Sequence, residues 1–346
     1  MKETLAVKYR PITFDEVIGQ EYIKEILTNQ VESGNIGKAY LYTGVSGIGK
    51  TTIARIFAQL IDAEVIEIDA ASNNGVENIR NINENVHYKP LVNKYKVYII
   101  DEAHMLSKGA WNAMLKTLEE PPPHAIFILA TTEAHKVPAT IISRSQRFNF
   151  TRPSTDLIFE NLTRIVTNES QSTNPDVLKY ISKLADGGVR LSITMLESCL
   201  NVTTDLDVPM VEEILGYIPT KYFIDILKAV VESNREEIIK LVQQYHSDGM
   251  DFHRFIENLV MFVLDLQKYA VTRDMKYLRT SSLYKDDIKG IMNIIVRKFD
   301  KDISKLEQEL NRISTIINRL YYESQRLEPK RYLLEVALLS LTNNPS

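Results

Sequence analysis

The sequence predicts an α/β module on a five-stranded parallel sheet, followed by a small helical domain and an all-helical C-terminal domain. Short β-rich runs alternate with helical patterns from residue 39 to about residue 150, which is the rhythm of a doubly wound α/β layer. The β-rich runs stop after Arg152-Pro153, and the rest of the sequence follows a helical period. Because 346 residues exceed one typical hydrophobic core, two or three domains are expected.

The α/β module is predicted over residues 1–152, and it begins with an amphipathic helix. This helix covers residues 14–31, with Thr13 or Asp15 as the cap at its start. Further helices cover residues 51–60 and 107–118. The latter ends before the proline run at 121–123, since proline cannot continue a helix. The five strands are predicted at residues 39–43, 65–69, 97–100, 126–130 and 147–150.

Two helical domains are predicted after this module, over residues 153–208 and 209–346. The first is interrupted at residues 185–188 by the sequence Ala-Asp-Gly-Gly, and a soft boundary at residues 205–209 separates it from the second. One long helix of the second domain carries a heptad-like apolar seam that requires a partner helix. We expect the partner within the same bundle, with a subunit interface as the alternative. The seam consists of Ile303, Leu306, Leu310, Ile313, Ile317 and Leu320.

The composition excludes some classes of protein. Charged residues make up 25% of the chain and hydrophobic residues 44%, as in an ordinary soluble globular protein. No apolar run is long enough to span a bilayer and no charged-then-apolar leader is present, so we expect a cytoplasmic protein without a membrane partner. Cys199 is the single cysteine, which excludes a disulfide within the chain and a multi-cysteine zinc site. The net charge of −4 argues against non-specific coating of nucleic acid and leaves room for a local basic face.

Residues 44–52 carry the strongest chemical signal. The sequence fits the P-loop pattern G-x-x-x-x-G-K-[ST] directly after a β-rich run and at the start of a helix. Glycines let backbone N–H groups curl around phosphate oxygens, Lys50 adds a positive charge at the β- and γ-phosphates, and Thr51 offers a hydroxyl to Mg²⁺. A nucleoside triphosphate is therefore the expected ligand, and a glycine-rich turn that only caps the helix is the alternative. Binding is assigned to Gly44, Val45, Ser46, Gly47, Ile48, Gly49, Lys50, Thr51 and Thr52.

Two carboxylates, Asp101 and Glu102, follow the apolar run at residues 96–100. They fall at the carboxyl edge of a parallel sheet, where ligands gather. Asp101 is placed to hold Mg²⁺ through its water shell, and Glu102 to orient or deprotonate the water that attacks the γ-phosphate. Together with Lys50 they predict a hydrolase, and an ordinary acidic pair at a helix N-terminus is the alternative. His104 is assigned no catalytic role, because a lone histidine after a strand is more often a loop or packing residue.

The sequence carries a set of motifs at Tyr9-Arg10-Pro11, residues 44–52, EIDAAS at 67–72, DEAHMLS at 101–107, LKTLEEPP at 115–122 and ATT at 130–132. Taken together, these motifs resemble those of the AAA+ clamp-loader ATPases. The resemblance is dense over the α/β module and thinner toward the C-terminus, where Glu328-Pro329 and the apolar helix after it look like the end of that family's collar. It implies an AAA+ module followed by a helical lid over residues 153–208 and an all-α collar over residues 209–346 that holds subunits together.

The resemblance implies a residue that acts on a neighbouring subunit. Arg144, within Ser143-Arg144-Ser145, corresponds to the arginine finger that reaches the γ-phosphate held next door, so the catalytic site would be complete only in a ring. The family has cysteine where this chain has Ser145, and the finger itself is intact. An exposed arginine at a helix end is the alternative, and the two differ sharply in consequence, because a finger contributes about 10³ to 10⁵ in rate.

Other positions of the resemblance fall around the nucleotide. Thr131 and Thr132 end a strand beside the two carboxylates, where a hydroxyl could sense the γ-phosphate or its attacking water; a strand-end cap is the alternative. Arg190 matches the second-sensor arginine of the lid. The segment against which the adenine packs corresponds to Tyr9, Arg10 and Pro11.

DNA contacts are expected inside the ring, where helix N-termini and basic side chains point at phosphates. Arg80 and Lys116 match phosphate-contacting positions of the family, and Lys108 is added because it begins a helix. Two neighbouring basic positions of the family are Asn73 and Gly75 here. The alternative for each of these three residues is an ordinary solvated surface side chain that does not contact DNA.

One departure from the family is large. Its bacterial members carry a four-cysteine zinc module between the P-loop helix and the next strand, and here only residues 54–64 separate Thr52 from Val65. We expect a reduced member, without the zinc module and without the C-terminal extension of longer members.

The implied function is that of an ATPase subunit of a sliding-clamp loader. With ATP and Mg²⁺ it would open the clamp and load it onto primer-template DNA, in a ring-shaped, pentameric assembly with other loader subunits. One alternative is another AAA+ DNA-processing ATPase, for branch migration or replication restart. A second alternative is a structural loader subunit that does not hydrolyse ATP.

Overall fold

The computed structural model describes residues 3–280, 284–298 and 303–343. By internal packing the chain separates into two compact units. Unit 1 comprises residues 1–170 and 185–197, and unit 2 comprises residues 171–184 and 198–346. The division into three domains at residues 152 and 208 stays a prediction.

Unit 1 is built on a five-stranded sheet in which all paired strands are parallel and the order is β2-β3-β4-β1-β5. Each predicted strand is present, and the bounds differ from the predicted ones by two residues at most. The strands are β1 (Ala39–Thr43), β2 (Ala63–Asp69), β3 (Tyr95–Asp101), β4 (Ala125–Thr131) and β5 (Gln146–Asn149).

The central strands are largely apolar and buried because helices cover both faces of the sheet. Along β3, Val97 and Ile99 join the core on one face, whereas Tyr98 and Ile100 join the core on the other. All seven residues of β4 are buried. The sheet is thus fixed between two hydrophobic layers, and its strand ends are held in register.

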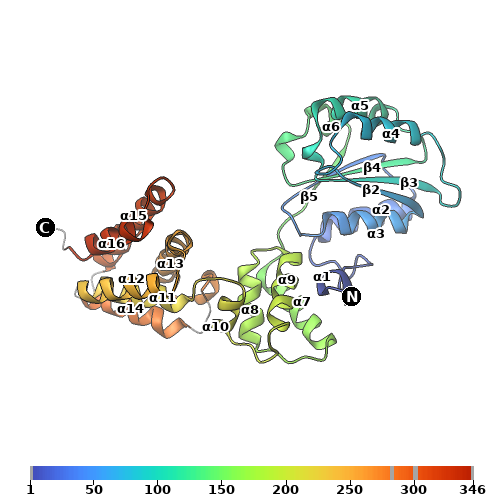
Figure 1. Ribbon diagram of the computed structural model, residues 1–346. Coiled ribbons are helices and arrows are strands. Elements are labelled where there is room, and N and C mark those ends of the chain that lie inside the picture. The colour runs from blue at the N-terminus through green and yellow to red at the C-terminus, as the bar shows by residue number, and fades with distance from the viewer. Residues whose placement is uncertain (1–2, 281–283, 299–302, 344–346) are drawn as a thin grey trace. The chain divides into compact units, whose positions relative to one another are not determined.

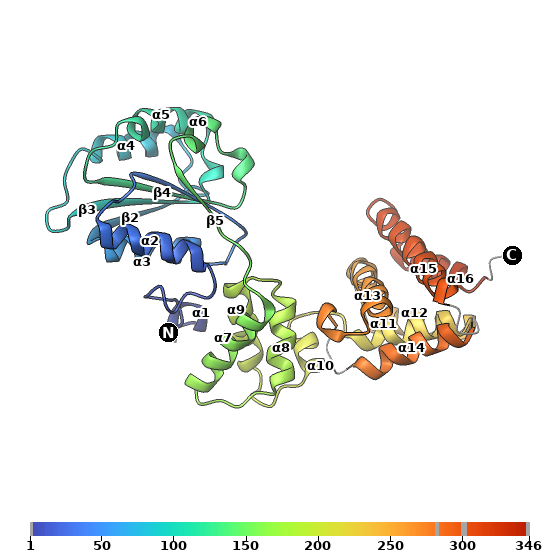
Figure 2. The same cartoon turned by 180° about the vertical axis from the view of Figure 1, so that it is seen from behind.

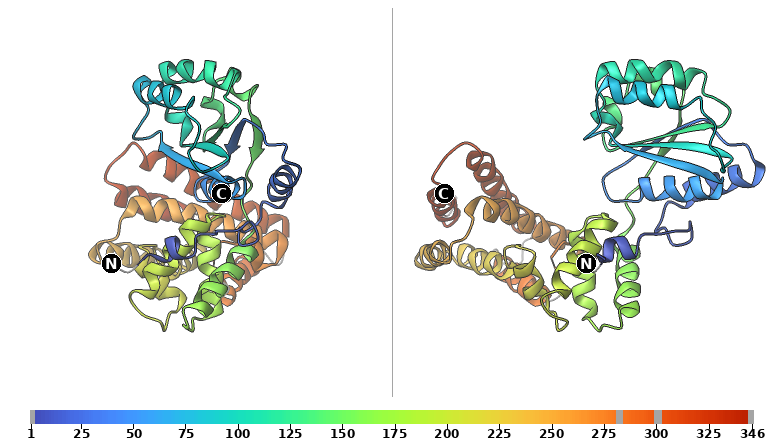
Figure 3. Two further views of the ribbon diagram at one scale, coloured as in Figure 1. Left: turned by 90° about the vertical axis from the view of Figure 1, so that its right-hand side faces the viewer. Right: turned by 45° about the vertical axis from the view of Figure 1, so that its right-hand side comes forward.

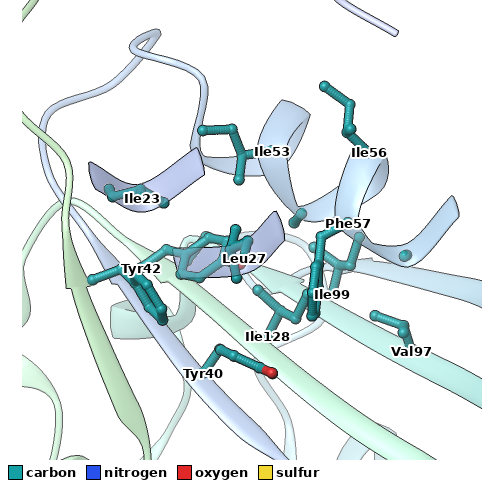
Figure 4. Close-up of a cluster of buried hydrophobic side chains, with 14 of the residues drawn as sticks. Ile23, Leu27, Tyr40, Tyr42, Ile53, Ile56, Phe57, Val97, Ile99 and Ile128 are labelled. Atoms are coloured by element: carbon teal, nitrogen blue, oxygen red, sulfur yellow. The ribbon is translucent and has the colours of Figure 1, made fainter. Parts of the chain in front are cut away.

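Helices α2 (Glu21–Ser33) and α3 (Lys50–Leu60) cover one face of the sheet, and α4 (Val76–Asn85), α5 (Lys108–Glu119) and α6 (Ala139–Ile142) cover the other (Figures 1 and 3). The core beneath α2 and α3 contains Tyr40, Phe57 and Ile128 (Figure 4). The opposite core contains Trp111 of α5, which is 4% exposed.

The first long helix begins later than predicted. We expected it at residue 14 with Thr13 or Asp15 as its cap, but α2 begins at Glu21 after turns. Gly19 (φ 66°) and Gln20 (φ 61°) both have left-handed backbone conformations, which no helix can contain. Gln20 is fixed there by Thr151, because its side-chain amide donates to the Thr151 carbonyl (2.6 Å) and accepts from the Thr151 N–H (3.2 Å).

Unit 1 also contains α1 (Leu5–Lys8), α7 (Thr155–Asn168) and the part of α9 (Val189–Leu200) up to Glu197. Two short 3₁₀ turns, η1 (Ala103–Met105) and η2 (Ala134–Lys136), follow β3 and β4. The Tyr9 hydroxyl donates to Glu169 Oε1 at 2.6 Å, which ties the end of α1 to the end of α7.

Unit 2 is helical throughout its described residues. Figure 2 shows its later helices from behind, with α13 and α15 side by side. Its elements are α8 (Pro175–Leu184), α10 (Val208–Ile214), α11 (Thr220–Val231), α12 (Arg235–Ser247), α13 (Phe252–Thr272), η3 (Met275–Tyr277), α14 (Lys285–Lys298), α15 (Ile303–Ser324) and α16 (Lys330–Leu341).

A fully buried carboxylate joins α8 to the helices that follow it. Glu212 of α10 accepts from the hydroxyls of Tyr180 (2.9 Å), Thr220 (2.5 Å) and Tyr284 (3.2 Å), and from the Thr220 N–H (3.2 Å). The charge is tolerated because its oxygens are hydrogen-bonded.

The apolar seam of α15 lies inside unit 2. Leu306, Leu310, Ile313, Ile317 and Leu320 are each at most 2% exposed, and α15 packs against α13 and α16. The prediction of a partner helix in the same bundle is confirmed for these five residues; the side chain of Ile303 lies outside the described residues. No helix in the described part of the chain is long and apolar enough to cross a bilayer.

Candidate nucleotide site

The phosphate-binding candidate is the loop between β1 and α3. Gly44 has φ 150°, and a Cβ there would lie 2.8 Å from the Phe150 carbonyl oxygen, so only glycine fits without a shift. Gly49 (φ 101°) caps α3 in a left-handed conformation that directs the chain into the helix. The loop therefore presents backbone N–H groups at a helix N-terminus, the arrangement that binds anions.

Lys50 points into this loop. Its Nζ donates to the carbonyls of Gly44 and Val45, both at 2.8 Å, and the residue is 6% exposed. Burial lowers the pKa of Lys50 below its usual value, and Glu102 and Asp101 partly offset this. An ammonium group held here without a full counter-charge is suited to a polyanion such as a triphosphate.

The residues proposed for Mg²⁺ come together. The Thr51 hydroxyl donates to Asp101 Oδ2 at 2.7 Å, although the two residues are 50 positions apart. A hydroxyl and a carboxylate are the oxygen ligands that Mg²⁺ prefers, and they lie beside the phosphate loop. The donor set therefore fits the metal.

Glu102 has an unusual backbone. Its φ of 47° and ψ of 42° are left-handed, which is uncommon for a residue with a side chain and often marks a functional site. Its N–H donates to Asp101 Oδ1 (2.9 Å), and the Thr132 hydroxyl donates to its Oε2 (3.2 Å). Strand β4 lies between β1 and β3, and the residue after its end, Thr132, reaches Glu102.

A cavity of about 290 Å³ lies over the P-loop within unit 1. Its wall includes Tyr9-Arg10-Pro11, residues 46–52, both carboxylates and Arg190. Five of the residues predicted for nucleotide binding and catalysis do not line it: Gly44, Val45, Thr131, Thr132 and Arg144. The backbone carbonyls of Gly44 and Val45 accept hydrogen bonds from Lys50, which does line the cavity. Thr132 contacts Glu102, another residue of the cavity wall.

Several pocket residues were not predicted from the sequence. Arg55 forms two hydrogen bonds to Glu67, at 2.7 and 2.8 Å, and both residues line the cavity. Burial, with Arg55 and Arg190 nearby, lowers the pKa of Arg10. Lys50 and Arg55 lie on the same helix, but their spacing is not one that places two side chains on one face. The sequence therefore does not indicate that both line one cavity. The cationic side chains of the wall are Arg10, Lys50, Arg55, Arg164 and Arg190.

Arg144 lies on the surface, away from the cavity of its own chain. Its guanidinium donates to Glu119 Oε1 (2.7 Å) and to the Thr140 carbonyl (2.8 Å). The side chains of Arg144 and Glu119 are 35% and 48% exposed. The group is therefore accessible to another molecule.

The three residues proposed to contact DNA share one layer of unit 1. Arg80 of α4 and Lys108 and Lys116 of α5 are all exposed, and α4 packs against α5 (Figure 1). Arg80 forms an exposed ion pair with Glu77 at 3.4 Å. The charges are thus available on one side of the sheet.

The P-loop helix connects to the next strand by a short turn. Helix α3 ends at Leu60 and β2 begins at Ala63, so only Ile61 and Asp62 lie between them. Asp62 takes the left-handed conformation (φ 54°) that such a tight reversal needs. There is no inserted module at this position.

Two family models match the chain. One, for the DNA polymerase III delta subunit, matches residues 61–154, and one for domain III of the DNA polymerase III subunits gamma and tau matches residues 206–294. The tau subunit of DNA polymerase III from Bacillus subtilis is 35% identical over 363 residues, which cover 96% of this chain and 62% of that protein. The gamma subunit from Buchnera aphidicola is 35% identical over 286 residues, which cover 75% of this chain and 79% of that protein. This chain belongs to the DNA polymerase III gamma/tau family.

The alignments with gamma/tau subunits cover most of this chain but only part of the length of the longer relatives. The alignment with the gamma/tau subunit from Mycoplasma genitalium, at 34% identity over 304 residues, covers 80% of this chain and 51% of that protein. The chain thus spans between 51% and 62% of the length of these two longer relatives.

A solved structure supports the fold of this gamma/tau family member. The Holliday junction branch migration motor RuvB from Thermotoga maritima has a TM-score of 0.52 and 20% sequence identity, over 70% of this chain and 86% of that chain. At this identity the likeness concerns the fold alone. The α/β module has the AAA+ P-loop architecture that the sequence predicts, followed by the helical region that matches gamma and tau domain III.

Proposed function

We propose that the chain is an ATPase subunit of a sliding-clamp loader, which opens a processivity clamp and loads it onto primer-template DNA. The observation that carries the ATPase part is the convergence of Lys50, Thr51 and Asp101 with Glu102 at one cavity. Membership in the gamma/tau family supports the loader part. ATP would supply the differential affinity between an assembly that holds an open clamp and one that releases it.

In this proposal each residue of the site has its own role in binding or hydrolysing ATP. The P-loop amides and Lys50 bind the phosphates, and Tyr9, Arg10 and Pro11 receive the adenine. Arg190 contacts the phosphates from α9. Thr51 and Asp101 would hold Mg²⁺, which when bound neutralises charge on the phosphates. Glu102 orients the attacking water, with Thr132 beside it, and Thr131 supports this strand end.

Arg144 acts in trans in this proposal. Its place outside its own cavity supports this, because an arginine that served its own nucleotide would have to line that cavity. Hydrolysis then depends on a neighbouring subunit, so we propose a ring with other loader subunits, pentameric as in the resemblance, with the collar over residues 209–346 holding it together. Arg80, Lys108 and Lys116 contact DNA phosphates inside that ring.

Two alternatives are less well supported. The fold likeness to a branch migration motor is at 20% identity, whereas relatives at 33 to 35% identity are DNA polymerase III subunits. A scaffold subunit that does not hydrolyse ATP has no need of Glu102 in a left-handed conformation next to Asp101.

The test is a pair of substitutions in the full chain. Lys50→Ala should abolish ATP binding, measured by calorimetry or a fluorescent analogue, because the phosphates lose their P-loop cation. Glu102→Gln should keep ATP bound and lower hydrolysis by at least about 100-fold, since only the water-orienting carboxylate is lost. Equal nucleotide affinity in wild type and Lys50→Ala would exclude this site.

The loader part has its own measurement. Wild-type chain, assembled with its partner subunits, should transfer a labelled sliding clamp to primed DNA only with ATP. The Glu102→Gln assembly should bind the clamp and fail to release it on DNA. Strong ATP hydrolysis stimulated by a four-way junction and not by primed DNA with clamp would favour the branch-migration alternative.

A further inference from the structure

His104 lies between Glu102 and the turn that follows β4. Its side chain is 8% exposed and does not line the nucleotide cavity. Its Nδ1 is 3.1 Å from Thr131 Oγ1 and 3.3 Å from Glu102 Oε2. At the other side of the ring, Nε2 is 3.4 Å from Glu133 Oε1. One imidazole thus faces the carboxylate of Glu102 and both ends of the turn from Thr131 to Glu133.

The turn itself is ordered around the same groups. The Glu133 N–H donates to Thr131 Oγ1 at 3.0 Å, and Thr131 is fully buried. Glu133 also pairs with Lys136 (2.9 Å) and His135 (3.6 Å) of η2. The Nε2 side of the His104 ring therefore contacts a residue, Glu133, that is also held by other residues of the turn and of η2.

Glu102 has more need of support than an ordinary surface glutamate. Its side chain has several rotatable bonds and is 33% exposed, so by itself it would sample many positions. Its Oε2 is the atom that Thr132 and His104 both approach, from two different elements. A base that must orient one water molecule requires such neighbours to hold its geometry.

A packing role alone does not explain these contacts. A buried ring that only filled space would be surrounded by apolar atoms, whereas this ring faces two carboxylates and a hydroxyl. Buried polar groups in such positions are retained for the hydrogen bonds that they make.

We propose that His104 is a positioning residue for ATP hydrolysis: its Nδ1 side holds the Glu102 carboxylate against the end of β4, while its Nε2 side rests on Glu133. The inference depends on the proposed role of Glu102 and adds a residue to it. His104 does not touch the nucleotide, so its loss should lower the rate of hydrolysis without weakening binding.

The experiment compares three variants in the assembled complex, with ATP turnover on primed DNA and ADP affinity by calorimetry. His104→Ala should lower kcat by about 10-fold or more and leave the KM for ATP and the ADP affinity within about 2-fold. His104→Asn, whose amide reaches the place of Nδ1, should stay within about 3-fold of the wild-type kcat. His104→Gln, whose amide reaches the place of Nε2, should resemble His104→Ala.

His135→Ala is the matched control. His135 also contacts Glu133, but it is 76% exposed and has no contact with Glu102 among those described, so its loss should leave kcat unchanged. Thermal unfolding of all variants shows whether unit 1 is intact. If His104→Ala does not fold, the comparison of the Asn and Gln variants decides the matter, and a Gln variant faster than the Asn variant would overturn the assignment of Nδ1.

A double substitution separates positioning from general damage. If His104 acts through Glu102, His104→Ala should lower the residual rate of Glu102→Gln by less than about 2-fold. A drop as large as that seen with Glu102 present would overturn the proposal, as would a wild-type kcat in His104→Ala. Failure of the proposed function looks different: Glu102→Gln would then hydrolyse ATP at the wild-type rate, whatever residue stands at position 104.

Discussion

The residues proposed to act on the nucleotide are held in place by partners far away in sequence. Thr51 reaches Asp101 over 50 positions, and Thr132 reaches Glu102 over 30. The P-loop and both carboxylates could be identified from the sequence because a local pattern specifies them. The contacts of His104 and Glu119 could not, because they depend on which strand ends and turns lie next to one another in the folded sheet.

Arg144 and Glu119 provide a prediction at this scale. In the isolated chain the proposed finger is paired with Glu119, so a neighbouring nucleotide has to compete with that carboxylate. An exposed pair contributes about 0.2–1 kcal/mol, which is a factor of up to about 5. Glu119→Gln should therefore raise ATP turnover of the assembled complex by up to about 5-fold, whereas Arg144→Ala should lower it by about 10³-fold.

Glu120→Gln is the control for this pair, because Glu120 is exposed and no contact with Arg144 is among those described. ATP affinity should be the same in all these variants, since the proposed finger would serve another subunit's site. If Glu119→Gln and Glu120→Gln changed turnover equally, the effect would come from net charge and not from the release of Arg144.

At the scale of elements, the sequence predicts the regular parts better than their ends. Strands β1, β3 and β4 were found because buried parallel strands are largely continuous apolar runs bounded by turns. The edge strands β2 and β5 are mostly exposed and carry a weaker apolar signal. The predicted start of this helix at residue 14 was wrong, because the apolar period of residues 14–20 continues into α2 without a break. The helix begins only at Glu21, since Gln20 is held in a left-handed conformation by Thr151, 131 positions away. A local pattern contains no sign of such a tertiary contact.

Two glycines give opposite predictions for the stability of their elements. At Gly44 a Cβ would approach both Ile48 Cδ1 and the Phe150 carbonyl oxygen to 2.8 Å, so Gly44→Ala should destabilise the P-loop end of β1 by about 1–3 kcal/mol. A Cβ at Gly290, within α14, would have no atom within 4 Å apart from its chain neighbours and the nearby backbone of its own helix. Gly290→Ala should stabilise its helix by about 0.5–1 kcal/mol.

Denaturant unfolding of the two glycine variants checks this. Gly44→Ala should also bind ADP more weakly, because the carbonyl of residue 44 holds Lys50. An unchanged unfolding midpoint in Gly44→Ala would mean that the loop has room to shift, and the close approach to Phe150 would then carry no constraint.

At the scale of the whole molecule, the two units share a sensitivity to alkaline pH. Burial raises the pKa of Tyr40 and Tyr98 in unit 1 to about 12, and raises that of Tyr180 and Tyr245 in unit 2 as well. Above the ordinary value of 10.0, the unfolded chain loses phenolic protons that the folded chain keeps. Ionisation therefore favours unfolding, and stability should fall as the pH rises beyond 10.0.

We expect the midpoint of thermal unfolding to drop by roughly 5 °C or more between about pH 9 and about pH 11.5. Tyr98→Phe is the matched variant, because the Tyr98 hydroxyl has no hydrogen-bond partner and its ring stacks on Phe127 at 5.2 Å. This variant should be at least as stable as wild type at neutral pH and lose less at high pH. Parallel midpoints for the two proteins across this range would contradict the assignment to buried phenols.

The division of the molecule into units could not be predicted from the sequence. The sequence predicts one helical domain over residues 153–208, and this division stays a prediction. In the structure the Tyr180 hydroxyl of α8 donates to the buried Glu212 of α10, and both helices belong to unit 2. The preceding helix α7 belongs instead with unit 1. Only the three-dimensional partners of each helix reveal this grouping.

Trp111 is the single tryptophan of the chain, and it is buried against the sheet in unit 1. Its intrinsic fluorescence, excited at the red edge where tyrosine does not absorb, therefore reports on unit 1 alone. Far-ultraviolet circular dichroism is dominated by helices, which both units contain. If the two optical signals follow one transition, the chain unfolds as a single cooperative system; if they separate, the gap between their midpoints measures how independently unit 1 and unit 2 are stabilised.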